Sequence, residues 1–154
     1  MSLQASRKLR STRAHTALEL VCSMFFLTIF ALLGADMGVI MLGAYQNDRA
    51  CRDAARSAAL GQDAVQSTKL AIAALKAHAG DGYYFSNPAL NGAIVYNDFL
   101  GNPPPQTSPF VTVSTQTTAK APFAPLHYSD NAIFLDGGTI TFKQKYTFPI
   151  VRTK

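Results

Sequence analysis

The sequence predicts an α+β protein in which a long N-terminal helix and a second helix precede a small antiparallel sheet. Two observations lead to this fold class. A long apolar stretch near the N-terminus runs without a break into an alanine-rich stretch, and β-branched residues alternate with polar ones towards the C-terminus. Of the 154 residues, 48 % are hydrophobic and 15 % are charged, which suits one small domain attached to an unusually apolar segment.

The apolar stretch is the first predicted element. Between residues 20 and 47, Asp36 is the only charged residue. A helix of this length reaches about 40 Å, and the hydrocarbon core of a bilayer is about 30 Å thick. A signal peptide has a shorter apolar region that ends at a cleavage site, and a small domain can hardly enclose such a rod as a buried helix. We therefore expect a transmembrane helix over residues 15–46.

Positive charge is concentrated at the N-terminus. Residues 1–16 hold four basic residues and no acid, so only +1 of the net charge of +5 belongs to the rest of the chain. A basic surface for nucleic acid is therefore not expected. Short basic flanks stay on the cytoplasmic side of a membrane, which predicts a cytoplasmic leader over residues 1–14 and export of everything after about Tyr45. The basic residues are Arg7, Lys8, Arg10 and Arg13.

The long helix is expected to continue outside the membrane as an amphipathic half, to about Leu60. Its charges lie three or four residues apart, which lets Arg49 meet Asp53 and Arg52 meet Arg56 on a solvated face. Alanine dominates the opposite, flat face. These alanines are residues 50, 54, 55, 58 and 59.

A second helix completes the exported helical region, residues 47–80. Gly61 ends or bends the first helix, Asp63 is a suitable N-cap for the second, and Gly80 stops it after about His78. We expect one side of this helix to be apolar. The residues on that side are Val65, Ile72, Leu75 and Ala79.

Residues 81–154 are predicted to form the antiparallel β domain, with three or four strands packed on the exported half of the helix. A short strand is expected within residues 93–99, and alternation predicts another over residues 110–117. A hairpin is predicted from residues 132–135, the turn 136–138 and a strand over residues 139–151. The inner face of that last strand consists of Ile140, Phe142, Tyr146, Phe148 and Ile150, and threonines and lysines form its outer face.

The sequence contains no pattern typical of catalysis, so we expect a protein that is not an enzyme. The three histidines and two cysteines lack the spacing of metal ligands, and no cofactor motif is present. His127, Ser129 and Asp130 lie in no nucleophile turn. The aromatic run of residues 83–85 has no basic groove around it, which favours packing over base stacking.

Cys22 and Cys51 are too far apart on one helix to form a disulfide. Cys22 is expected to face lipid or another helix. Cys51 is expected to be an unpaired thiol outside the membrane, either buried or available to a neighbouring chain.

Two carboxylates in or beside the apolar stretch need an explanation. Glu19 lies at its inner end and Asp36 near its outer end, about 26 Å apart along a helix. An acid within a membrane is expensive unless it is paired, so both residues are candidate subunit contacts. Alternatively, Asp36 reaches water near the headgroups, and Glu19 lies near Arg13 or lipid headgroups.

The run STRAHTALELVCSMFFLTIFALLGADMGVIMLGAYQNDRACRDAARSAAL resembles the start of TadE-like minor pilins, or pseudopilins, of the tight-adherence (Flp) branch of type IV pili. The resemblance rests on the basic leader, a small residue followed after four residues by Glu19, Asp36 with Gly38, and an alanine-rich helix over residues 46–59. The C-terminal GTITFKQKYTFPIV is similar to the closing strand of that family. Ala14 stands where the family favours glycine, and Leu20 where an aromatic residue often follows.

The resemblance implies a pilin-like fold and a structural role. It implies a minor pilin of the bacterial inner membrane, whose partners are the lipid bilayer, other pilin subunits and the pilus assembly machinery. It further implies a prepilin peptidase that cleaves between Ala14 and His15, after which Glu19 meets the terminal amine of a neighbouring subunit. Two alternatives stay open: a permanently membrane-anchored exported binding module, and a major filament subunit.

Overall fold

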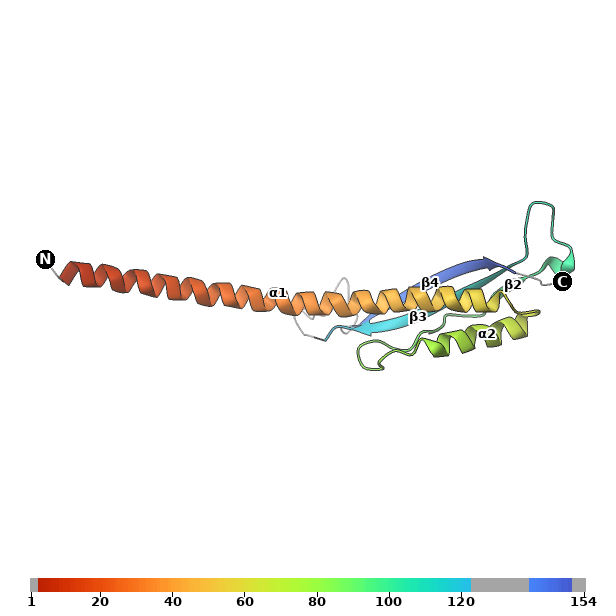
Figure 1. Cartoon of the computed structure of the whole chain (residues 1–154), viewed down its shortest axis with the longest axis horizontal. Helices are drawn as coiled ribbons and strands as arrows, with labels where there is room; N and C mark the ends of the chain where they lie inside the picture. Colours follow the sequence, from red (N-terminus) through yellow and green to blue (C-terminus); the bar gives the residue numbers. More distant parts are fainter. Residues whose placement is uncertain (1–2, 123–138, 151–154) are drawn as a thin grey trace.

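A computed structural model describes residues 3–122 and 139–150, with side chains from residue 15 on. It shows an α+β fold in which two helices cover one face of a four-stranded antiparallel sheet, as predicted (Figure 1). The elements are α1 (Leu3–Ala58), α2 (Ala64–Ala77), β1 (Ala89–Leu90), β2 (Val95–Asn97), the 3₁₀ turn η1 (Phe99–Gly101), β3 (Phe110–Lys120) and β4 (Thr139–Pro149).

The helix α1 is a single rod of 56 residues. The predicted continuous helix from about residue 15 to about Leu60 is confirmed, and it also extends through the basic segment as far as Leu3. Its C-terminal half packs along the sheet, and its N-terminal half projects away from the domain (Figure 1). Gly34 and Gly38 lie within this rod and do not interrupt it. In the part of the chain that the structure describes, α1 is the one helix long and apolar enough to cross a membrane or to act as a signal sequence.

The predicted cap of α2 is confirmed, but the predicted inner face is confirmed only at Leu75. Asp63 accepts a 2.6 Å hydrogen bond from the backbone N–H of Gln66, which satisfies a donor that the first turn leaves free. Val65, Ile72 and Ala79 are exposed. The buried side chains of α2 are Ser67, Ala71 and Leu75.

Small residues explain this inner face. Gly61 lies so close to α2 that a Cβ atom there would be 2.2 Å from Oγ of Ser67. Ala71 in turn packs in one cluster with Ala54 and Ala58 of α1. A close approach of two backbones selects small side chains over large ones, so the larger Val65 and Ile72 point away from α1.

The strand β3 is the centre of the sheet. Along one side it pairs antiparallel with the whole of β4, from Phe110 opposite Pro149 to Lys120 opposite Thr139. Along the other side it pairs with two short pieces, β1 and β2. The predicted strand over residues 110–117 is therefore confirmed, and the one within 93–99 shortens to β2. The predicted hairpin segment 132–138 lies outside the described residues.

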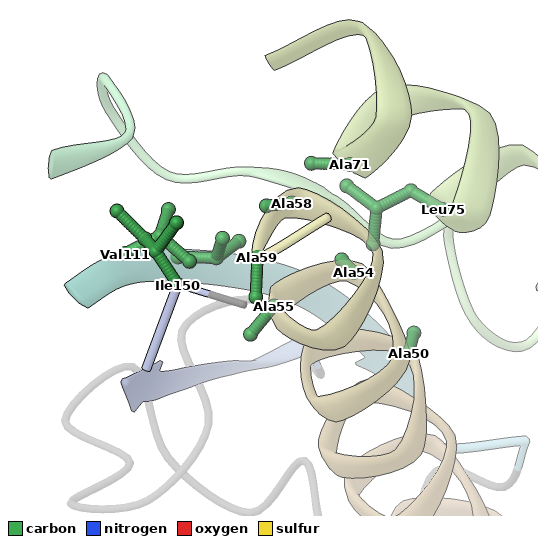
Figure 2. Close-up of a cluster of buried hydrophobic side chains, with 10 residues drawn as sticks. Ala50, Ala54, Ala55, Ala58, Ala59, Ala71, Leu75, Val111 and Ile150 are labelled. Atoms are coloured by element: carbon green, nitrogen blue, oxygen red, sulfur yellow. The ribbon is translucent and has the colours of Figure 1, made fainter. Parts of the chain in front are cut away.

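The core lies between the C-terminal half of α1, the α2 helix and the inner face of the sheet. The predicted alternation of β4 is confirmed, because its even-numbered residues are half-buried and its odd-numbered ones exposed. Most residues of the buried hydrophobic cluster are alanines (Figure 2). The cluster consists of Ala50, Ala54, Ala55, Ala58, Ala59, Ala71, Leu75, Val111, Val113 and Ile150.

Candidate functional site

The exposed apolar surface of the N-terminal half of α1 is the main unusual feature of the molecule. Eleven large apolar side chains in this half are each 49–71 % exposed. Apolar surface of this extent marks contact with a membrane or with other protein. The side chains are Leu18, Leu20, Val21, Met24, Phe25, Phe26, Leu27, Phe30, Met37, Met41 and Leu42.

The sequence-predicted site residues all lie on this half of α1, but they do not come together. His15 and Glu19 are exposed. The side chain of Ala14 lies outside the described residues. Asp36 is fully buried, although its neighbours Ala35 and Met37 are exposed. Glu19 and Asp36 remain about 26 Å apart along one straight helix, so they form two separate points rather than one site.

Asn47 fixes the other half of α1 to the sheet. Its side chain is fully buried, and its Nδ2 donates to the backbone carbonyl of Phe142 at 3.2 Å. Its Oδ1 accepts hydrogen bonds from the hydroxyls of Thr115 at 3.0 Å and Thr117 at 3.1 Å. One amide therefore joins α1 to both long strands, and each of these buried polar groups has a partner.

Neighbouring polar residues fix α1 to α2. Nε2 of Gln46 donates to the backbone carbonyl of Ala79 at 3.2 Å, just beyond the end of α2. Nε2 of His78 lies 2.9 Å from a carboxylate oxygen of Asp53. The predicted pair of Arg49 with Asp53 is therefore wrong, because Asp53 faces the end of α2 instead.

A third set of polar contacts runs along the edge where α1 meets β4. The Tyr146 hydroxyl donates to Asp48 at 2.6 Å, and Arg52 donates to the other oxygen of Asp48 at 2.9 Å. The guanidinium groups of Arg52 and Arg56 lie over the rings of Tyr146 and Phe148, at 5.3 and 5.7 Å from the ring centroids. The hydrogen bond to Tyr146 and the charges around it raise the pKa of Arg52. The arginines thus cover aromatic rings as well as facing solvent.

Cys51 is a structural residue. Its side chain is fully buried, and its Sγ lies 3.5 Å from the backbone carbonyl of Val113. Burial raises the pKa of this thiol and keeps it protonated. Of the two alternatives for Cys51, the buried one is confirmed. Cys22 is exposed on the apolar half of α1.

A tightly built loop follows α2. Oδ1 of Asp81 accepts hydrogen bonds from the backbone N–H groups of Tyr83, Tyr84 and Phe85 at 3.0 to 3.1 Å. Desolvation opposes the charged form of Asp81, but these three bonds outweigh it and lower the pKa of the carboxyl. The carboxylate therefore fixes the shape of the loop.

A shallow groove of about 420 Å³ lies between the end of α2 and β1. Most of its lining is apolar, with Lys76 as its one charged residue. Among the described residues, no group of three or more histidines, cysteines or acids gathers as metal ligands would.

The architecture is pilin-like: a long N-terminal apolar helix packed by its second half on a small antiparallel sheet. Comparisons with protein-family models, with curated proteins and with solved structures give no match to this chain.

Proposed function

We propose that this chain is a minor pilin, or pseudopilin, of a tight-adherence type IV pilus. It inserts in the bacterial inner membrane with its N-terminus in the cytoplasm and its domain exported, and it contributes structure rather than chemistry. The exposed apolar half of α1, continuous with the half that Asn47 fixes to the sheet, carries this proposal. Such a surface suits lipid before assembly and neighbouring helices afterwards.

The partners follow from this role. Other pilin subunits and the pilus assembly machinery bind the chain, and a prepilin peptidase cleaves it between Ala14 and His15. Glu19 is the subunit contact at the inner end of the helix. Among packed helices its charge is expensive unless it is paired, and the new terminal ammonium of a neighbouring subunit is a suitable partner.

Replacement of Glu19 tests the proposal. Glu19→Gln keeps the size of the side chain and removes its charge. We expect this variant to insert in the membrane at normal levels and to fail to support pilus assembly in cells that lack the native copy. Thr28→Val is the matched control, because among the described residues the Thr28 hydroxyl bonds within its own helix, to the carbonyl of Met24 at 2.8 Å. Wild-type piliation with Glu19→Gln would contradict the role of the carboxylate.

A permanently membrane-anchored binding module is the second candidate. The apolar groove between α2 and β1 favours it, because a groove of this kind can take up a ligand. The intact mass of the chain isolated from membranes separates the two candidates. Loss of residues 1–14 supports the pilin, and a full-length mature chain supports the anchored module.

A further inference from the structure

The end of β3 and the loop after α2 contact α1 just beyond Leu42, the last of its exposed large apolar residues before Tyr45. Gly43 follows the last of those apolar residues, Leu42, and it packs directly against the sheet. A Cβ atom at Gly43 would lie 3.0 Å from Cβ of Ala119 and 3.7 Å from Cβ of Phe85. The end of β3 and the loop after α2 therefore lie beside α1 where its exposed apolar surface ends (Figure 1).

The loop over residues 80–85 is held firmly in this place. The backbone N–H of Lys120 donates a 2.6 Å hydrogen bond to the backbone carbonyl of Tyr84. Phe85 forms a β-bridge with Ala119. The three N–H bonds to Asp81 close the loop on itself. Gly82 adopts a φ of 72°, which other residues rarely accept.

This loop presents amphipathic side chains at that level. The side chain of Tyr83 is 74 % exposed, and its ring stands edge-on to that of Tyr84, with 4.8 Å between the centroids. On α1, Tyr45 is 64 % exposed two residues beyond Gly43. Lys120, whose backbone N–H is bonded to Tyr84, is also exposed. Tyrosine and lysine are the side chains that settle where hydrocarbon gives way to headgroups.

We propose that the loop 80–85, together with Tyr45, lies in the headgroup region of the outer leaflet and seats the exported domain on the bilayer. The bilayer is the occupant of this surface because the surface continues directly from the apolar half of α1. Tyr83 contributes a ring to the interface and a hydroxyl to water. The inference rests on the membrane insertion of α1 that the proposed function includes.

The absence of tryptophan from the sequence allows a site-specific test in the full-length chain. Single variants are reconstituted in phosphatidylcholine vesicles that carry bromine either near the headgroup or near the end of the acyl chain. Tyr83→Trp tests the loop, and Phe30→Trp reports insertion of α1. Leu60→Trp is the matched control, because Leu60 is 66 % exposed but lies about 25 Å further along the axis.

We expect Tyr83→Trp to lose more fluorescence to the shallow bromines than to the deep ones, Phe30→Trp to show the reverse, and Leu60→Trp to lose none. Quenching of Phe30→Trp without quenching of Tyr83→Trp would overturn the inference and leave membrane insertion standing. No quenching at either position would overturn insertion and the inference together.

Discussion

Thr117 and Asn47 are separated by 70 residues in the sequence, yet the Thr117 hydroxyl donates to Oδ1 of Asn47 across 3.1 Å in the buried core. Thr115 donates to the same oxygen. The Asn47 amide therefore holds α1 against the sheet by hydrogen bonds, a role that large apolar side chains have in most cores.

Replacement of Asn47 by leucine is expected to destabilise the domain by about 2–4 kcal/mol, because it leaves two buried hydroxyls and one carbonyl without their partner. Denaturant unfolding of the full chain in detergent micelles measures the loss. Gln46→Leu is the control, because Gln46 makes a single exposed hydrogen bond, and it should lose no more than about 1 kcal/mol. Equal stability of the two variants would show that Asn47 is not the main link.

Gly61→Ala is expected to destabilise the packing of α2 on α1 by more than 1 kcal/mol. The new Cβ would lie 2.2 Å from Oγ of Ser67 and 2.6 Å from its backbone N, so the start of α2 must shift. Addition of Ser67→Ala should not restore stability, because the backbone contact remains. Thermal unfolding followed by circular dichroism measures the change.

Gly34→Ala is the matched control for Gly61→Ala. A Cβ atom at Gly34 meets nothing within 4 Å, and alanine favours a helix over glycine, so no loss is expected. Similar losses at the two positions would mean that helix geometry, rather than the contact with Ser67, decides the result.

Asp81→Asn is expected to change how stability depends on pH. The folded state lowers the pKa of Asp81 below its ordinary value of 3.8. The carboxylate therefore contributes stability above pH 3.8, and this contribution is lost as the pH falls through the lower, folded-state value. The wild-type protein should have a higher melting temperature than the variant at pH 7, and this difference should shrink below pH 3.8. A difference in melting temperature that stays constant down to pH 2 would contradict this account.

Cys51 is expected to resist alkylation in the folded chain. In a Cys22→Ser background, a maleimide should leave the native protein unmodified by mass and label it fully in denaturant, because Cys51 is buried and its pKa is raised. The converse Cys51→Ser variant retains the exposed Cys22 and serves as the labelling control in detergent. Rapid labelling of Cys51 in the native chain would show that this part of the core opens.

Periodicity made much of the fold predictable from the sequence. The long helix follows from an unbroken run without strong helix breakers, and the inner face of β4 follows from strict alternation of its residues. Asp63 was predictable as a cap because its role depends only on the next three residues. These are all local signals.

The contacts between distant segments could not be predicted in the same way. Which residues of α2 face inwards depends on how closely α1 approaches it. The hydrophobic pattern of α2 does not indicate that distance. Asp53 has Arg49 as a suitable partner one turn away, yet it faces His78. The burial of Asn47 and Asp36 also depends on tertiary packing, and polar residues on a helix otherwise suggest a solvated face.

The direction of the strands has a mechanical consequence. Both β3 and β4 run along the axis of α1 (Figure 1), and the bonds from Asn47 and from Asp48 to Tyr146 cross between helix and sheet side by side. A pull on the N-terminal end of α1 therefore loads these bonds in shear, all at once, rather than peeling them apart one after another. A rod joined to its domain in this way transmits tension along its length while the domain stays folded.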